Sequence, residues 1–139
     1  MLPEPLAYGV TVTYDNSMFV VGGMNNDGSR GAVYRVKIVD GKAEVSTLPS
    51  LPCTADNMAG ALVGRHLYIA GGAMDGKASN RVLRLDLDNL SAGWQDVKPF
   101  PGMARVQPVA GSMGDNCFCL FGGFAPASNG EEAKLAMDG

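Results

Sequence analysis

Polar side chains occupy matching places in two stretches of this sequence, and they are the best candidates for binding a small polar molecule. Asp56 and Asn57 precede one run of small and apolar residues, and Arg105 and Gln107 precede another. An arginine in such a place can hold a carboxylate through two parallel hydrogen bonds. The alternative is that Arg105 ties a linker to the neighbouring repeat. Together with Arg30, from a polar loop, these residues form the predicted binding site, but they identify no reaction.

The other polar residues of interest receive structural interpretations. His66, the only histidine, follows a Gly64-Arg65 turn, where we expect it to be solvated and on the face opposite the candidate site. Asp27 and Asp75 each precede a glycine, a pairing typical of tight turns. The sequence contains neither a nucleophile elbow nor a phosphate-binding loop.

The cysteines predict core packing rather than chemistry. There are three of them, and an odd number argues against a disulfide framework. Cys117 and Cys119 lie two apart in a predicted strand, so their side chains share one face, and we expect them to fill the core of a repeat. A metal site would need further His or Cys ligands close by in the sequence. We therefore predict no metal and no cofactor.

A repeat sets the elements that position these residues. Apolar runs end on Gly22-Gly23, Gly71-Gly72 and Gly122-Gly123, at intervals of 49 and 51 residues. A period of about 50 residues, built on a strand that ends in two glycines, is typical of kelch-type β-propeller blades. The predicted fold class is therefore all-β, with two full blades and most of a third, at residues 6–48, 57–98 and 105–139.

Each predicted blade begins with a small, apolar stretch that we expect to be its innermost strand, because inner strands converge on the propeller axis. These strands are predicted at 7–14, 58–63 and 107–112. The linker before each inner strand and the loop after each Gly-Gly then lie on one face, which places the candidate site at a common mouth. Trp94 is predicted to pack between blades, and the third strand of the last blade is predicted at 133–139.

Three blades cannot close a ring, because closed propellers have about four to eight. The predicted ring is therefore incomplete, and its end strands leave edges that invite pairing with another chain. One interpretation is a piece of a longer protein that supplies the remaining blades. The other is assembly of copies, and two chains of three blades each would form a six-bladed homodimer.

Composition and charge exclude several classes of partner. The chain has 139 residues, of which 46% are hydrophobic and 18% charged, as expected of a globular protein. Its net charge of −3 argues against nucleic acid, which needs a basic face. The sequence has no apolar run approaching the roughly 20 residues that cross a bilayer, so we predict no membrane partner.

Two segments carry a resemblance to a known family. The segment 6–23, with its Ala-Tyr-Gly and Gly-Gly elements, resembles the last blade of the sialic acid mutarotases, also called N-acetylneuraminate epimerases. The segment 100–123 carries Phe-Pro-Gly, Arg-x-Gln and Phe-Gly-Gly elements and looks like the first full blade of that family. Because the C-terminal pattern comes first, the order is similar to the cyclically permuted group of the family.

The resemblance implies a six-bladed propeller that interconverts the anomers of N-acetylneuraminate, or of a similar sugar acid, without a cofactor. A base would take the anomeric hydroxyl proton while an acid protonates the ring oxygen. Arg105 would hold the sugar carboxylate, and Asn57 and Gln107 would bind hydroxyls or the N-acetyl group; the acid and base are not assigned. The resemblance also implies a periplasmic or secreted bacterial protein. The alternatives are a non-catalytic kelch interaction module and an inactive fragment.

Overall fold

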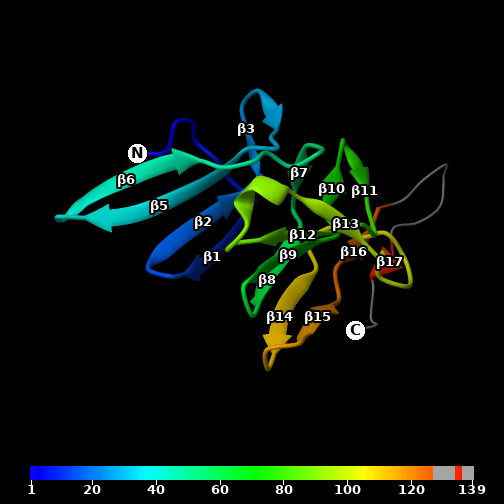
Figure 1. The fold of residues 1–139 in the computed structure, drawn as a ribbon. Helices are drawn as coiled ribbons and strands as arrows, with labels where there is room; N and C mark the ends of the chain where they lie inside the picture. Colours follow the sequence, from blue (N-terminus) through cyan, green and yellow to red (C-terminus); the bar gives the residue numbers. More distant parts are fainter. Residues whose placement is uncertain (127–133, 136–139) are drawn as a thin grey trace.

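The computed structural model describes residues 1–126 and 134–135, and it consists almost entirely of short antiparallel strands (Figure 1). Two four-stranded sheets form complete blades, in the spatial orders β1-β2-β5-β6 and β8-β9-β12-β13. The hairpin β14-β15 begins a third blade. The strands of blade 1 are β1 (Val10–Tyr14), β2 (Ser17–Val21), β5 (Val33–Val39) and β6 (Lys42–Thr47). Those of blades 2 and 3 are β8 (Ala59–Val63), β9 (His66–Ala70), β12 (Val82–Asp86), β13 (Gln95–Val97), β14 (Val109–Met113) and β15 (Cys117–Phe121).

Shorter strands gather where the second strand of each blade ends. The hairpin β3-β4 follows β2, and the hairpin β10-β11 follows β9 and adds β7 as a third strand. A single 3-10 turn, η1 (Leu90–Ala92), connects β12 to β13. The short strands are β3 (Met24–Asn25), β4 (Gly28–Ser29), β7 (Ala55–Asp56), β10 (Ala73–Met74), β11 (Lys77–Ala78), β16 (Phe124–Ala125) and β17 (Lys134–Leu135). The architecture is that of kelch-type propeller blades, and the predicted all-β fold class is confirmed.

The inner strands are shorter at their N-terminal ends than predicted, and the cause is the same in each blade. Ala7, Asp56 and Val106 pair separately with the segments that follow the Gly-Gly pairs, at Met24, Ala73 and Phe124 respectively. The next residue of each linker then adopts a left-handed backbone conformation, which turns the chain before the inner strand begins. The inner strands therefore begin at Val10, Ala59 and Val109.

The last predicted strand lies mostly outside the described residues. Lys134 and Leu135 fall within it, but they pair with Phe124 and Ala125 in the hairpin β16-β17. The prediction that these two residues continue the third blade beside β15 is therefore wrong. Their partner is the short segment directly after Gly122-Gly123, which is closer along the chain than β15 is.

The Gly-Gly pairs allow the linker of the same blade to cross directly over them. A Cβ atom on Gly72 would lie 2.5 Å from the carbonyl oxygen of Asp56 and 2.5 Å from the amide nitrogen of Met58. The equivalent atom on Gly23 would lie 2.6 Å from the carbonyl oxygen of Ala7. No side chain fits at these distances. Because the second glycine of each pair has no side chain, the linker backbone can lie directly against it at the mouth.

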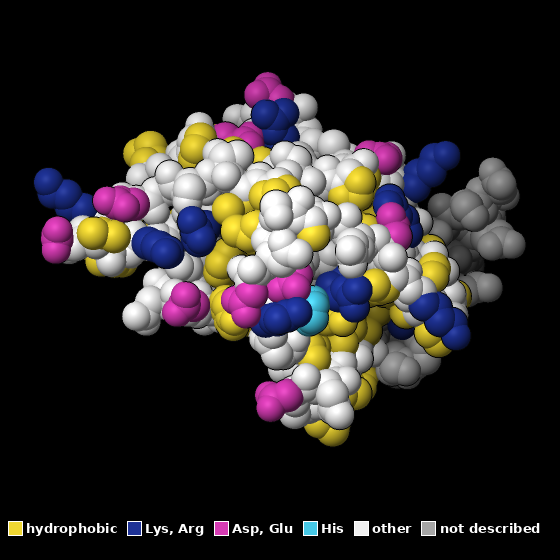
Figure 2. Space-filling view, in the orientation of Figure 1, with side chains coloured by type: hydrophobic (Ala, Val, Ile, Leu, Met, Phe, Trp, Pro, Cys, Tyr) yellow, Lys and Arg dark blue, Asp and Glu magenta, His cyan; other side chains and the backbone are white. Residues whose placement is uncertain are grey.

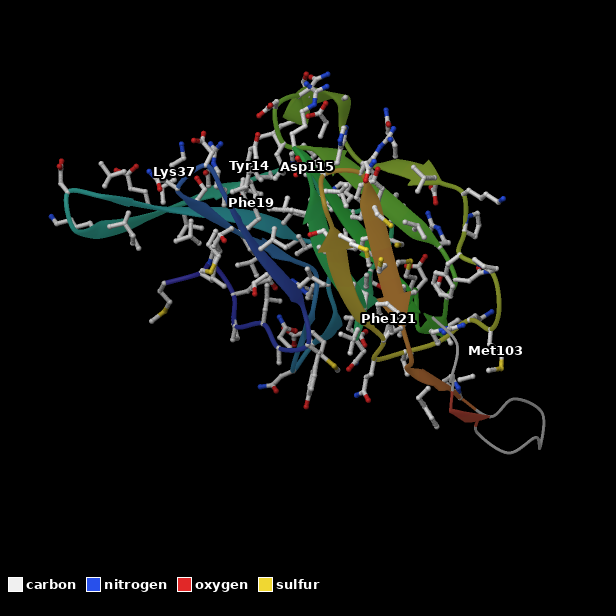
Figure 3. All side chains as sticks on the ribbon, turned by 90° about the horizontal axis from the view of Figure 1, so that it is seen from below. Tyr14, Phe19, Lys37, Met103, Asp115 and Phe121 are labelled. Carbon is white, nitrogen blue, oxygen red and sulfur yellow. The ribbon has the colours of Figure 1, made fainter. Side chains whose placement is uncertain are left out.

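The hydrophobic core lies between the blades, and the middle blade is its centre. The most deeply buried large side chains are Leu67, Ile69, Leu83 and Leu85 of blade 2, with Val21 and Val33 of blade 1. Blade 2 contacts β1 on one side and β14 on the other, so its inner strand β8 is covered from both sides. Figure 3 shows Phe19, from the blue strand β2, lying toward the green strands of blade 2.

Trp94 packs against this core and connects the two complete blades. Its indole nitrogen donates a hydrogen bond to the carbonyl oxygen of Pro49, in the linker that follows blade 1, at 3.0 Å. Half-buried, it contacts the buried cluster at the edge of blade 2. The predicted position of Trp94 between blades is therefore confirmed.

Candidate functional site

Three residues at equivalent places form a backbone ladder where the blades meet at the axis. Tyr8, Asn57 and Gln107 each lie two residues before the first residue of an inner strand. The amide of Asn57 donates to the carbonyl of Tyr8 at 2.9 Å, and the amide of Gln107 donates to the carbonyl of Asn57 at 2.7 Å. Each blade thus repeats one hydrogen bond to its predecessor, and the three side chains occupy successive positions around the axis.

All three residues of this ladder have positive φ angles, of 60° for Tyr8 and 53° for both Asn57 and Gln107. The left-handed region costs roughly 1–2 kcal/mol for residues other than glycine, and Asn tolerates it best. Because a glycine would adopt this backbone without strain, the retained side chains are the feature that needs explaining. The side chains of Tyr8 and Gln107 are exposed, and that of Asn57 is half-buried. The ladder therefore presents polar groups to solvent from a strained and well-defined backbone.

Side-chain hydrogen bonds join the predicted site residues of this region. Asn57 Nδ2 donates to Asp56 Oδ1 at 2.6 Å, and Gln107 Nε2 approaches Asn57 Oδ1 at 3.3 Å. Asp56 itself is buried, with 8% of its surface exposed. The carboxylate therefore orients the amide of Asn57, and Asn57 in turn orients the amide of Gln107. The structure brings these three predicted residues together, although their role in binding stays a prediction.

Arg105 lies beneath the mouth rather than in it. Only 2% of its surface is exposed. Its Nε donates to the carbonyl of Met103 at 3.0 Å, its NH1 donates to the carbonyl of Gly122 at 3.3 Å, and its guanidinium lies 5.1 Å from the ring centroid of Phe100. These contacts tie the linker before blade 3 to the end of β15, which corresponds to the structural alternative.

Arg30 is held in a separate cluster around the N-terminal segment. Its Nε forms an ion pair with Glu4 Oε2 at 2.8 Å, and the same carboxylate accepts hydrogen bonds from Asn25 and from the Tyr34 hydroxyl. The Tyr34 hydrogen bond is the largest influence on Glu4 and lowers its pKa, partial burial opposes this shift, and Arg30 lowers the pKa further. Burial and the Glu4 carboxylate raise the pKa of Tyr34. The side chain of Arg30 thus pairs with Glu4 rather than with Asn57 or Gln107.

Tyr8 belongs to the ladder but was absent from the predicted site. A signal for it existed, because Tyr8 precedes Asn57 by 49 residues, the same interval that separates the first two Gly-Gly pairs. Tyr8 is 63% exposed, and an exposed aromatic ring can stack on a bound sugar. We add Tyr8 to the candidate site on this geometry.

The remaining predicted features lie away from the ladder. His66 begins β9, and its Nε2 lies 3.8 Å from Asp86 Oδ2, which also pairs with Arg65. At about 3.3 Å per residue, the length of β9 separates His66 from the Gly71 end by roughly 15 Å. Figure 2 shows the single histidine, in cyan, among charged side chains. This arrangement agrees with the expected position of His66 opposite the mouth.

The prediction that Cys117 and Cys119 fill the core of a repeat is wrong. All three are free thiols, and the Sγ atoms of Cys117 and Cys119 lie 3.7 Å apart, so the two side chains do share a face. However, Cys117 is exposed and Cys119 only half-buried, so they do not fill a closed core. The reason is that they face away from blade 2, on the side of blade 3 that is uncovered in the described part of the chain. Within that part, the structure contains no cluster of three or more metal-ligating side chains.

Comparison with known proteins supports a kelch-family relationship. No protein-family model matches the chain. An N-acetylneuraminate epimerase from Haemophilus influenzae is 35% identical over 89 residues, which cover 64% of this chain and 22% of the relative. One from Yersinia enterocolitica is 32% identical over 96 residues, covering 69% and 23%. A kelch domain-containing protein from Vibrio cholerae is 32% identical over 92 residues, covering 66% and 24%.

The matched region is a small part of each relative. The chain spans less than a quarter of the length of these curated proteins, and the matched 89 to 96 residues correspond to about two repeats of the Gly-Gly period. No helix among the described residues has the length and apolar character needed to span a membrane. Over about two thirds of its length, this chain is similar to the kelch-repeat sialic acid mutarotases, or N-acetylneuraminate epimerases, and the resemblance carried by its sequence motifs is confirmed.

Proposed function

We propose that the ladder of Tyr8, Asn57 and Gln107, with Asp56 beneath it, binds a sugar acid such as N-acetylneuraminate at the mouth of a propeller. The observation that supports this is a row of exposed or half-buried polar side chains on backbone with positive φ, where glycine would carry no strain. The relatives that are named N-acetylneuraminate epimerases suggest which sugar acid to test.

The chemistry of these groups suits a sugar with hydroxyl and acetamido substituents. Each side-chain amide has two N–H donors and one oxygen acceptor, and a sugar hydroxyl both donates and accepts. Asp56 accepts the hydrogen bond from Asn57 Nδ2, so the orientation of that amide is set before any ligand arrives. Such preorganisation reduces the entropy lost on binding. The tyrosine ring at the end of the ladder supplies an apolar surface for one face of the sugar.

We further propose that the complete ring interconverts the anomers of the bound sugar acid. A base removes the proton of the anomeric hydroxyl, an acid protonates the ring oxygen, and the ring carbon–oxygen bond breaks to give the open keto form. Rotation about the bond that joins the keto carbon to the sugar chain turns the other face of the carbonyl toward the hydroxyl, and reversal of both proton transfers recloses the ring as the other anomer. In this proposal the ladder residues bind and orient the sugar, and further blades contribute to proton transfer. A bacterial periplasmic or secreted location would fit such a function.

The experiment is to replace ladder side chains by glycine, which retains the backbone conformation and removes the amide. Binding of N-acetylneuraminate by the full chain is measured by saturation-transfer NMR, and anomer exchange by exchange spectroscopy. Asn57→Gly and Gln107→Gly are expected to weaken binding by about tenfold or more each, the effect of losing roughly 1.4 kcal/mol. Gln107→Gly is expected to be at least as stable as the parent, because it relieves backbone strain. Asn57→Gly relieves the same strain but removes the donor to the buried Asp56 carboxylate, so its fold is checked by circular dichroism.

Asn16→Gly is the matched control. Asn16 has the same φ of 53°, but it lies in the β1-β2 turn, at the opposite end of the inner strand from the ladder. This variant removes an amide and relieves the same strain without touching the mouth, so it is expected to bind the sugar normally. The proposal fails if the parent chain binds no sugar acid, or if all three variants bind like the parent. A kelch interaction module would give that result.

A further inference from the structure

A groove of about 500 Å³ lies between blades 1 and 2, apart from the ladder, and we call it the inter-blade groove. Glu4 and Arg30 line it on the side of blade 1, Asp75 of the β10-β11 turn lines it on the side of blade 2, and the linker 50–54 lies between them. Figure 1 shows the hairpins β3-β4 and β10-β11 on the same side of the molecule, with β7 between them. Both bordering blades are complete four-stranded sheets. The volume lies in the range of about 300–1,000 Å³ that small-molecule sites occupy.

Glu4 fixes one side of the inter-blade groove and has little capacity left for a ligand. Its Oε1 accepts a hydrogen bond from the Tyr34 hydroxyl at 2.8 Å. Its Oε2 accepts from Asn25 Nδ2 at 3.0 Å and from Arg30 Nε at 2.8 Å. With three donors on two oxygens, Glu4 holds Arg30 in place. A ligand in the groove therefore meets the charges of Arg30 and Asp75.

Arg30 presents one edge of its guanidinium to the groove. Its Nε is bonded to Glu4, and 42% of its side chain is exposed. In the part of the chain that the structure describes, NH1 and NH2 of Arg30 make no hydrogen bond. Two parallel N–H groups on a guanidinium edge match the two oxygens of a carboxylate. Arg30 is thus oriented in advance for a carboxylate ligand.

Asp75 is held by the linker through one carboxylate oxygen. Its Oδ1 accepts from the Thr54 amide at 3.0 Å and from the Thr54 hydroxyl at 3.3 Å, and its own amide donates to the Thr54 carbonyl at 3.0 Å. Its Oδ2 makes no hydrogen bond to any described residue. Because the side chain is exposed, this oxygen can accept from a ligand, and a charged donor such as an ammonium group gives the strongest bond.

One segment of backbone separates the two groups. The amide of Ala55 donates to the carbonyl of Arg30 at 3.0 Å, and the preceding residue, Thr54, bonds to Asp75. Neighbouring hydrogen-bonded segments lie about 4.8 Å apart, so the backbones of Arg30 and Asp75 are roughly 10 Å apart. Both side chains reach into this span, which leaves room for a small molecule.

We propose that the inter-blade groove binds a small zwitterion of the α-amino acid type, with its carboxylate on Arg30 and its ammonium group on Asp75. The charged lining residues, two negative and one positive, give the groove a net charge of −1. A simple anion increases that negative charge, and a simple cation is repelled by the guanidinium. A zwitterion pairs both groups and leaves the net charge unchanged. None of the ladder residues lines the groove, so the inference does not rest on the proposed function.

The experiment records two-dimensional ¹⁵N–¹H NMR spectra of the full chain with three probes, which are free glycine, acetate and methylammonium. Free glycine is expected to cause saturable shifts at the amides of residues 29–32 and 50–54. Acetate and methylammonium each carry only one of the two charges, so they are expected to bind at least about tenfold more weakly. Backbone amides of the ladder are expected to stay unchanged.

Asp75→Asn is the most informative variant. Asparagine keeps an oxygen for Thr54 and tolerates the φ of 49°, but it removes the charge that attracts ammonium. It is expected to bind free glycine about tenfold more weakly and to bind acetate no more weakly than the parent. Arg30→Lys keeps a cation for Glu4 and loses the two-pronged edge, so it is expected to weaken both probes. Asp27→Asn is the matched control, since it removes the same charge from the β3-β4 turn, outside the groove lining.

The comparison of variants decides the outcome. The proposal is overturned if free glycine causes no saturable shift at the groove, or if acetate binds there more tightly than glycine. Equal losses for Asp75→Asn and Asp27→Asn also overturn it, because they would indicate a general effect of net charge. N-acetylneuraminate serves as a fourth probe. Shifts confined to the ladder keep the two sites separate, whereas shifts at the groove in place of those from glycine assign the groove to the sugar acid and overturn the zwitterion.

Discussion

Replacing Gly72 by alanine tests why this position is a glycine. The reason can be the close approach of other backbone atoms or the positive φ angle alone. Gly72 has a φ of 78°, and Gly76, in the β10-β11 turn, has a φ of 79°. Alanine should therefore suffer the same conformational cost at both positions, about 1–2 kcal/mol. The surroundings differ, because a Cβ on Gly76 meets no atom within 4 Å. Comparing the two alanine variants therefore separates the cost of the positive φ angle from the cost of steric overlap.

At Gly72 the added methyl group meets rigid backbone. It would lie 2.5 Å from the carbonyl oxygen of Asp56 and 2.7 Å from the Cα of Met58. Relief requires the two segments to move apart, which disturbs the hydrogen bonds from Gly72 to the carbonyl of Arg105 at 2.8 Å and from Ser79 to Gly72 at 2.9 Å. Each such bond contributes about 0.5–1.5 kcal/mol. We therefore expect Gly72→Ala to lower the free energy of unfolding by about 3–5 kcal/mol.

Urea denaturation followed by circular dichroism measures both variants against the parent. Gly76→Ala is expected to lower the free energy of unfolding by about 1–2 kcal/mol with an unchanged denaturant slope. For a small domain the larger loss can approach the total stability, so Gly72→Ala is also measured in a stabilising osmolyte. Equal losses for the two variants would refute the reasoning, since they would mean that the contacts of Gly72 contribute nothing.

Two further predictions concern charged side chains. Arg105→Ala leaves the carbonyls of Met103 and Gly122 without their guanidinium donor, so we expect a loss of about 2–4 kcal/mol in thermal or urea unfolding, with Arg105→Lys intermediate. Unchanged stability with lost sugar binding would instead make Arg105 a ligand of the carboxylate. Glu4 has a lowered pKa, so its stabilising contribution is complete above the pKa of the unfolded carboxyl and is lost as pH falls through the folded value. Glu4→Gln should remove this part of the acid dependence of the melting temperature, and an identical pH profile would contradict it.

Much of the architecture was predictable because it depends on local and periodic features. Gly-Gly pairs at near-constant spacing mark where the second strand of each blade ends, and this spacing can be read from the sequence without knowledge of any contact. The turn predicted at Asp75-Gly76 is confirmed, with positive φ at both residues. The position of Trp94 within its repeat likewise predicted its place between blades. These features share a cause, since each is encoded within a few residues.

Other properties of the site were not predictable in this way. The left-handed conformation of Tyr8 has no local signal, because tyrosine carries no preference for it, and it appears only when the linker must cross a Gly-Gly pair. The burial of Arg105 depends on Phe100 and Gly122, which the fold brings around it. The exposure of Cys117 and Cys119 depends on which blade covers which face.

The amino-acid sequence by itself determined the blades, their period, their turns and the face on which the mouth lies. Those follow from the two-residue alternation of strands and from glycines at fixed intervals, which act over short distances. Only the tertiary structure decided that Asn57 and Gln107 join Tyr8 in one ladder, that Arg105 is enclosed beneath it, and that Arg30 turns to Glu4. The physical reason is that these contacts connect residues of different blades or distant segments, and a side chain's partners there are chosen by packing rather than by its neighbours along the chain.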